Sequence, residues 1–293
     1  MLILICDAFS PDLPARLAPF GEVSDDPARL AEADVALIRS KTKASADWID
    51  AAANLKLIIR GGVGLDNVDQ AHARRRGVAV HNTAEASSIA VAELALAMLL
   101  AMPNHLIRAH GSMREGAWLK KELKRSELHG KTLGLLGAGH IGSEVARRAL
   151  AFGMTVIAHD PFLDRHPLAE LVPSLPDFLG RCDYISIHTP LTAQTEGMLD
   201  AAAFARMKDG VYLVNTARAK VVVEADMRAA LESGKVAGYA TDVWASDPPE
   251  DSPLRDAPNM LMTPHFGAST AENMGRIGDV IVSLLGDFVR VEA

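Results

Sequence analysis

The sequence predicts an α/β protein with two doubly wound parallel sheets, each in its own domain. The chain has 293 residues, more than one hydrophobic core usually supports, and 49% of them are apolar. Short apolar runs alternate with helical patterns along the chain, as expected for parallel sheets covered by helices. We expect residues 1–95 with 270–293 to form one domain, residues 96–269 to form a second, and a cleft to separate them.

Ten short apolar runs, each ending at a polar or glycine-rich turn, predict the strands of the two sheets. The first sheet is expected from residues 2–6, 35–38, 57–59 and 78–80. The second is expected from residues 133–136, 155–158, 184–187, 211–214, 237–240 and 260–262. The tract 88–102 is apolar nearly all round, which predicts a buried helix that joins the domains or forms a subunit interface. A last helix, from about Ala271, is expected to return to the first domain.

The segment 131–161 indicates a dinucleotide site and hence a Rossmann-like second domain. A short apolar strand runs into Gly137, Gly139 and Gly142, in the pattern G-x-G-x-x-G, and a helix follows at once. Glycines there allow a tight turn and a close approach of the backbone to a pyrophosphate at the helix N-terminus. Asp160 closes the next strand, where it is placed to bind ribose hydroxyls and to repel the extra phosphate of NADP. The alternative is an ordinary tight turn, but strand, helix and spaced acid together favour NAD.

Composition excludes several other classes of function. A formal net charge of -7 argues against a nucleic-acid surface, so an anionic substrate requires local arginines, lysines and backbone amides. Cys6 and Cys182 suggest small buried hydrophobes rather than a disulfide, and no Cys/His cluster has metal-ligand spacing, so we expect no structural metal. Signal-peptide features are lacking and the longest apolar tract is interrupted by Glu93, so a cytoplasmic protein is expected.

A basic cluster follows the apolar tract, and its simplest interpretation is a solvated face rather than a site for anionic substrate. The cluster consists of Lys120, Lys121, Lys124 and Arg125.

Three segments beyond the glycine turn suggest redox chemistry on an anion: NTAR, DVWASDP and TPHFG. Oxidation of a hydroxyl by a nicotinamide needs a base, and His265 is the best placed of ten histidines. Asp247 could fix the ring tautomer and favour the imidazolium, while Arg218 could grip a carboxylate. Each also has a simpler role: His265 in a turn, Asp247 in an acidic loop, and Arg218 in a surface ion pair.

These segments carry a resemblance that extends over nearly the whole chain. RSKTKASADWIDAAANLKLIIRGGVGLDNVD, GSMREGAW, ELHGKTLGLLGAGHIG, HTPLT, NTAR, DVW and TPHFGAST stand in the order and at the spacing found in one family. The chain resembles the D-isomer-specific 2-hydroxyacid dehydrogenases, most closely those that act on 3-phosphoglycerate. The resemblance implies a flavodoxin-like substrate domain, an NAD domain and, often, a homodimer assembled through the NAD domain.

The same resemblance implies roles for individual residues. Arg218, Asp247 and His265 occupy the catalytic positions, and the backbone at Gly62, Val63 and Gly64 meets the substrate carboxylate. Weaker substrate candidates are Arg39, Ser40, Lys41 and Arg60. The implied cofactor contacts, in addition to the glycine turn, are His140, Ile141, Asp160, Thr189, Pro190, Thr195, Thr216, Ala217 and Asp242.

The chain departs from the family pattern at three places. Asp247 stands where the family generally has Glu, which shortens the acid by one methylene and can require its loop to lie closer to His265. Ala219 and Lys220 replace Arg-Gly after the catalytic arginine. Glu85, with Ala86 and Ser87, replaces a Gly-Asn pair that is usual beside the substrate, which puts phosphate specificity in question.

We therefore expect an NAD-dependent oxidoreductase that interconverts a D-2-hydroxy acid and its 2-keto acid. The leading substrate pair is 3-phosphoglycerate and 3-phosphohydroxypyruvate, and the alternative is a glyoxylate or hydroxypyruvate reductase. An alternative of another class is an NAD-sensing binding protein similar to corepressors with the same scaffold.

Overall fold

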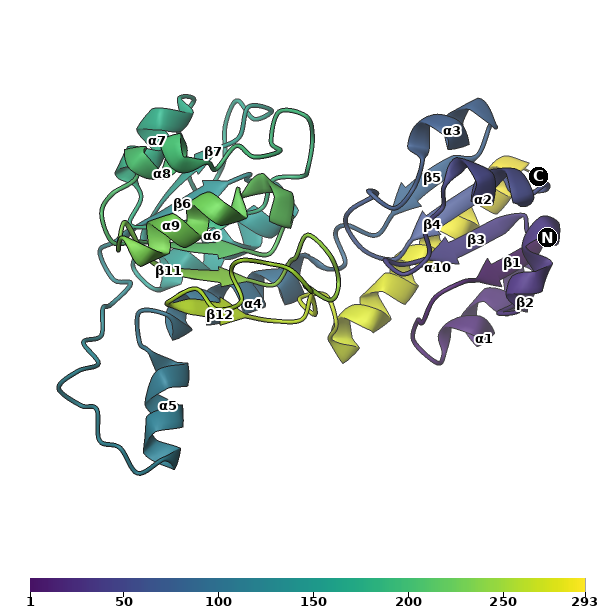
Figure 1. Cartoon of the computed structure of the whole chain (residues 1–293). Helices are drawn as coiled ribbons and strands as arrows, with labels where there is room; N and C mark the ends of the chain where they lie inside the picture. The colour runs from purple at the N-terminus through teal and green to yellow at the C-terminus, as the bar shows by residue number, and fades with distance from the viewer. Residues whose placement is uncertain (293) are drawn as a thin grey trace. The chain divides into compact units, whose positions relative to one another are not determined.

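The computed structural model describes residues 1–292, which separate into two compact units. One unit comprises Met1–Ala90 together with the C-terminal segment that begins at Ala268, and the other comprises Val91–Gly267. Each unit is built around its own parallel sheet (Figure 1). The predicted α/β class with two parallel sheets is therefore confirmed.

The first unit has a five-stranded sheet of order β2-β1-β3-β4-β5, with all neighbours parallel. This order is typical of flavodoxin-like sheets. Its strands are β1 (Leu2–Ile5), β2 (Glu22–Ser24), β3 (Val35–Ile38), β4 (Leu57–Arg60) and β5 (Ala79–Asn82). Its helices are α1 (Leu13–Leu17), α2 (Ala46–Ala51), α3 (Gln70–Arg75) and α10 (Ala271–Glu292), with short 3₁₀ helices at Ala18–Phe20 and Pro27–Glu32.

The long C-terminal helix completes the core of the first unit, as expected from the sequence. Ile277, Ile281 and Leu285 of α10 are fully buried against β1 and α1, where Ile3 and Leu13 are also fully buried. A separate cluster contains residues of α2 and α3. Both ends of the chain therefore contribute to one small hydrophobic core.

The second unit has a seven-stranded parallel sheet of order β12-β11-β10-β9-β6-β7-β8. Its strands are β6 (Thr132–Leu136), β7 (Thr155–His159), β8 (Glu170–Leu171), β9 (Tyr184–Ile187), β10 (Val211–Asn215), β11 (Val236–Thr241) and β12 (Met260–Met262). Its helices are α4 (Ser88–Ala101, which begins in the first unit), α5 (Leu106–Arg114), α6 (His140–Ala151), α7 (Leu175–Arg181), α8 (Ala201–Arg206) and α9 (Glu224–Glu232), with a 3₁₀ turn at Ala219–Val221.

Two hydrophobic clusters occupy the second unit. One contains α4 and α6, and the other contains α7, α8 and α9. Most of the apolar tract is buried as expected, since Ala92, Ala95 and Leu99 of α4 are fully buried, but Ile89 is exposed. The strand order reverses beside β6, which lies between β9 and β7, and this reversal is where α/β sheets bind their ligands.

Two edge strands were not foreseen in the sequence. β2 has only three residues and β8 only two, and each lies at an edge of its sheet. Strands this short have too few residues for an apolar period to be recognised.

Within residues 1–292, no single helix is long and apolar enough to cross a bilayer. Only when α4 and α5 are taken together are the length and apolar composition sufficient, and these two helices meet at a bend of 63°. The same residues contain no group of three or more His, Cys, Asp or Glu side chains that could hold a metal ion.

Packing in the second sheet gives a stability prediction for Gly134 in β6. A Cβ at this position would lie 2.2 Å from Cys182 Sγ and 2.7 Å from a Phe178 ring atom, and both of those side chains are fully buried. We expect Gly134→Ala to destabilise the protein by about 1–3 kcal/mol through overpacking, measured by chemical denaturation. Gly180→Ala on α7 is the control, because its Cβ would lie 3.6 Å from Arg206 O, an ordinary contact. Equal stability of the two variants would contradict the prediction.

Candidate active site

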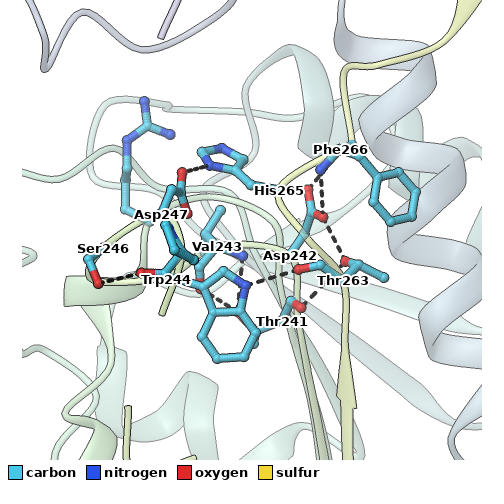
Figure 2. Close-up of polar contacts among 12 residues, drawn as sticks. Thr241, Asp242, Val243, Trp244, Ser246, Asp247, Thr263, His265 and Phe266 are labelled. Carbon is cyan, nitrogen blue, oxygen red and sulfur yellow. Dashed lines mark hydrogen bonds and ion pairs between the residues drawn. The ribbon is translucent and has the colours of Figure 1, made fainter. Parts of the chain in front are cut away.

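The central feature of the site is a histidine–aspartate pair at the carboxyl ends of β11 and β12. His265 follows β12 and Asp247 lies in the loop after β11, and His265 Nδ1 is 2.6 Å from Asp247 Oδ2 (Figure 2). Both side chains are about half exposed. The bond at Nδ1 leaves Nε2 available to a substrate, the arrangement expected of a general acid–base histidine.

The side chain of Asp247 is long enough to contact the imidazole ring of His265. The sequence raised the question of whether Asp247, one methylene shorter than Glu, can serve here, and the 2.6 Å separation shows that its loop brings the carboxylate close enough. His265 itself has φ +55°, a left-handed conformation that is uncommon for a residue with a side chain. The backbone around His265 must therefore be held by its neighbours.

Asp242 holds that backbone. Its carboxylate is 2% exposed and accepts three hydrogen bonds from the loop that carries His265. Thr263 Oγ1 donates to Oδ1 at 2.6 Å, Phe266 N to Oδ1 at 3.0 Å and Gly267 N to Oδ2 at 2.8 Å (Figure 2). Trp244 Nε1 donates to Thr263 O at 2.9 Å and fixes the start of the same loop. Asp242, expected to contact the cofactor, is thus also a scaffold for His265.

Arg218 follows β10, the next strand of the sheet after β11 and β12. Neighbouring strands are about 4.8 Å apart, so all three predicted catalytic residues come from adjacent strand ends. Arg218 NH1 donates to Ala217 O at 2.6 Å, and Asn215 Nδ2 donates to Arg218 O at 2.9 Å. Ala219 begins a 3₁₀ turn and is buried, so the fold accommodates a Cβ at this position.

The glycine turn after β6 has the features that a dinucleotide needs. Gly137 has φ +91°, and a Cβ there would lie 2.9 Å from the carbonyl of His188. Gly139 is the N-cap of α6, where no side chain caps the helix, and a Cβ at Gly139 would meet nothing within 4 Å. The first turn of α6, which contains His140, Ile141 and Gly142, therefore presents its N–H groups as a pyrophosphate site.

Asp160 and Thr216 also fit a bound dinucleotide. Asp160 accepts from Ala138 N at 2.9 Å and from Phe162 N at 3.0 Å, which ties the acid to the glycine turn. A carboxylate has about four acceptor positions, so it retains capacity for ribose hydroxyls. The buried Thr216 Oγ1 has no hydrogen-bond partner within the described part of the chain. Buried hydroxyls usually have such a partner, so this atom is available to hydrogen-bond a ligand.

The remaining predicted cofactor residues follow β9. Thr189 and Pro190 come after His188, the first residue beyond the strand, and Thr195 Oγ1 donates to Pro190 O at 2.6 Å, which closes the loop. His188, to which the sequence gave no role, lies beside Gly137, and desolvation lowers its pKa to about 3. This histidine stays neutral near neutral pH and does not compete with His265 as a base.

In the first unit, the predicted substrate loop follows β4. Gly62 has φ +142°, and a Cβ would lie 1.7 Å from Arg60 NH1, so the guanidinium lies against the glycine backbone. Gly62 N donates to Thr83 Oγ1 at 2.8 Å, which leaves the amides of Val63 and Gly64 as donors for a substrate. Arg39 follows β3, where burial lowers the pKa of its guanidinium.

The second unit matches a known family of domains. Residues 96–267 match the family model of the D-isomer specific 2-hydroxyacid dehydrogenase NAD binding domain. The chain belongs to the D-isomer specific 2-hydroxyacid dehydrogenase family. This membership confirms the resemblance seen in the sequence, the oxidoreductase class and NAD as the cofactor.

Two curated members of the family illustrate the range of relatives. The chain is 46% identical to the hydroxypyruvate reductase of Thermotoga maritima, over 86% of this chain and 83% of that protein. It is 42% identical to the D-3-phosphoglycerate dehydrogenase of Rattus norvegicus, over 90% of this chain but only 50% of that protein. The match therefore spans about half of the phosphoglycerate dehydrogenase.

A solved member of the family has the same fold. The D-lactate dehydrogenase of Aquifex aeolicus, complexed with NAD and lactic acid, has a TM-score of 0.87 and 28% identity, and the match covers 98% of this chain and 95% of that one.

The scaffold formed by Asp242 was not foreseen, because its partners are mainly backbone N–H groups, which every residue has. The sequence signal that could have shown it is the small Gly267, where a Cβ would lie 2.8 Å from Asp242 Oδ2. The position of His265 thus depends on a buried acid that follows β11, the strand next to β10 in the sheet.

Asp242→Asn tests this dependence. An amide accepts at only one of its two positions, so its NH₂ group would face one of the loop's N–H donors. We expect kcat to fall at least about tenfold, with a loss of stability of about 1–3 kcal/mol for the unsatisfied buried donor. Thr263→Val removes only one donor and should have a smaller effect on both measurements. Wild-type kcat in Asp242→Asn would contradict the scaffold role.

Proposed function

We propose that this dehydrogenase interconverts a small D-2-hydroxy acid and its 2-keto acid, with His265, Asp247 and Arg218 as catalytic residues. The observation that supports this most strongly is the His265–Asp247 pair, held at the strand edge of an NAD-binding domain. An NAD-sensing binding protein has no need of such a pair. Loss of NADH absorbance when a small 2-keto acid is added distinguishes the two functions.

Each residue has a chemical role that its surroundings support. NAD, when bound, supplies the two-electron acceptor or donor. His265 Nε2 removes the hydroxyl proton during oxidation and returns it during reduction, while Asp247 stabilises the imidazolium through Nδ1. Arg218 binds the substrate carboxylate with its planar fork and polarises the carbonyl. The substrate-binding groups proposed in the first unit are the amides of Val63 and Gly64, with Arg60 and Arg39.

Two kinds of substrate are candidates within this class: phosphorylated and unphosphorylated acids. The basic residues Arg39 and Arg60 and the similarity to phosphoglycerate dehydrogenases favour 3-phosphoglycerate and 3-phosphohydroxypyruvate. The similarity to a hydroxypyruvate reductase favours hydroxypyruvate or glyoxylate. Initial rates of NADH oxidation with the three keto acids, compared as kcat/KM at one pH, decide between them.

A cytoplasmic location is part of the proposal and follows only from the sequence.

His265→Ala tests the catalytic assignment. Because the ring holds and moves a proton and is not required to bind the nucleotide, kcat should fall by at least about 100-fold while the dissociation constant for NADH changes little. Stopped-flow rates and fluorescence titration with NADH give the two quantities. His129→Gln, at an exposed histidine before β6, is the control and should match wild type. Equal losses of kcat and NADH affinity in His265→Ala would refute the base assignment.

The proposal includes a homodimer assembled through an arm, residues 104–126, which comprises α5 and the segment after it. The arm stands away from the sheet of its unit (Figure 1). Ile107 and Trp118 are each 71% exposed, and Leu106 and Met113 are more than half exposed. Clustered apolar exposure of this kind marks interaction surfaces. The arm also carries six basic and two acidic residues in a chain of net charge -7, so a second copy offers an acidic partner surface.

The base of the arm is held firmly, which suits an interface. Arg125 Nε donates to Asn104 Oδ1 at 2.6 Å, and Asn104 Nδ2 donates to Leu100 O at 2.8 Å. The His105 ring also contacts the Lys124 carbonyl at 3.0 Å. Little conformational entropy is then lost when the arm docks.

The double variant Ile107→Asp and Trp118→Asp tests the interface. Buried charges in an apolar contact are unfavourable, so a wild-type mass of two chains should change to one in light scattering coupled to gel filtration. Phe162→Asp, at a 90% exposed side chain outside the arm, should leave the dimer intact. A wild-type protein that elutes as a monomer would contradict the proposal directly.

A further inference from the structure

We propose that His166 is a positioning residue for NAD: it acts through Ser143 on the glycine turn and so sets the affinity of the protein for the dinucleotide. The inference rests on the proposed function only where that function requires NAD at the glycine turn. Neither His166 nor Ser143 was predicted from the sequence to serve the cofactor. A chain of hydrogen bonds joins the loop after β7, through these two side chains, to the backbone of the turn.

The first bond of this chain fixes the state of the His166 ring. Leu168 N donates to His166 Nδ1 at 3.2 Å. A backbone N–H can only donate, so Nδ1 accepts and the neutral ring carries its proton on Nε2. Desolvation lowers the pKa of His166, against the opposing effect of Asp160, and this also favours the neutral ring. His166 Nε2 is therefore a hydrogen-bond donor.

The proton on Nε2 fixes the direction of the next two bonds. His166 Nε2 lies 3.0 Å from Ser143 Oγ, so the ring donates to the hydroxyl. The hydroxyl has one proton of its own, which it donates to Ala138 O at 3.3 Å. Ser143 lies on α6, whose N-cap is Gly139. The chain of bonds thus ends at the residue between the first two glycines of the turn.

Ala138 is held at both of its backbone polar groups. Its N–H donates to Asp160 Oδ2 at 2.9 Å, and its carbonyl accepts from Ser143. The peptide that joins Ala138 to Gly139 is trans, so its C=O and N–H point in opposite directions. Because the carbonyl is directed at Ser143 Oγ, the Gly139 N–H is directed away from it. The Ser143 bond therefore fixes the direction of an N–H group at the pyrophosphate site.

A fixed N–H group binds a phosphate more tightly than a mobile one, because its orientation costs no further entropy on binding. Loss of the His166 bond leaves the Ser143 hydroxyl free to rotate away from Ala138 O. The turn is then held on one side only, by Asp160. We expect the affinity for NADH to fall, with little change in turnover at saturation, because the proposed catalytic residues follow β10, β11 and β12 rather than β6.

Asparagine and glutamine at position 166 separate the two bonds of the ring. The Asn oxygen can accept from the N–H two residues on, but Asn has no atom at the place of Nε2. The Gln side chain brings an amide NH₂ to that place and can donate to Ser143. We expect the dissociation constant of NADH, from fluorescence titration, to rise about threefold to tenfold in His166→Asn but less than about twofold in His166→Gln. In both variants kcat at saturating NADH should stay within about twofold of wild type.

Ser143→Ala removes the middle of the chain of bonds. It should raise the dissociation constant of NADH by a similar factor, and adding His166→Asn should then have no further effect, because both changes break one chain. ADP-ribose, which has the pyrophosphate but no nicotinamide, should lose affinity by the same factor as NADH in each variant.

His72→Asn is the matched control. The His72 ring is also hydrogen-bonded, with Nε2 2.8 Å from Asp50 Oδ1, but it lies in the first unit, outside the NAD-binding domain. This variant makes the same change of side chain away from the glycine turn. Its dissociation constants for NADH and ADP-ribose should equal those of wild type.

The possible outcomes separate this proposal from the proposed function. Weaker NADH binding in His166→Asn and Ser143→Ala, with recovery in His166→Gln, supports the positioning role. Wild-type affinity in His166→Asn and Ser143→Ala, independent effects in the double variant, or no recovery in His166→Gln overturns it. If wild-type protein binds NADH but reduces none of the three keto acids, the proposed function is overturned, and the dissociation constants still decide the role of His166. A wild-type protein that binds no NADH overturns both.

Discussion

The geometry of the candidate active site depends on one buried carboxylate, that of Asp242. A buried charge is unfavourable unless it is compensated, and here three donors from a single loop compensate it. The same bonds force the loop into a fixed path, which accommodates the left-handed backbone of His265. The ring is thereby directed at Asp247. Removal of the buried charge would relax the loop, so we expect Asp242 to affect activity through the position of His265.

His188 and His265 show how the environment of a histidine suits it to one role or another. His188 lies beside the glycine turn, where desolvation keeps it neutral, and its ring contacts Ser186 Oγ at 2.8 Å. His265 is half exposed and paired with a carboxylate. A neutral, enclosed ring is suited to support the turn against which a dinucleotide lies, whereas a solvated ring with an acidic partner is suited to exchange protons. The sequence alone places His188 and His265 at strand ends, but it does not show how far each ring is exposed to solvent.

The fold was largely predictable because parallel strands buried on both faces have continuous apolar runs, as in β9 and β3. The edge strands β2 and β8 were missed because they are too short to show a pattern. Among site residues, the pairing of His265 with Asp247 followed from the chemistry of the side chains. The loop scaffold around Asp242 did not, since backbone amides leave no trace in a sequence. The exposed arm was also missed, because Ile107 and Trp118 are apolar residues that a sequence pattern assigns to a core.

The residues proposed for catalysis all follow neighbouring strands at one edge of the seven-stranded sheet. Asp247 lies in the loop after β11, His265 follows β12 and Arg218 follows β10. Parallel strands end at the same edge of a sheet, so the loops that follow β10, β11 and β12 lie side by side. The separation of 2.6 Å between His265 Nδ1 and Asp247 Oδ2 therefore depends on the register of the sheet as well as on the loops. A change that shifted β12 against β11 would be expected to separate the pair without altering either side chain.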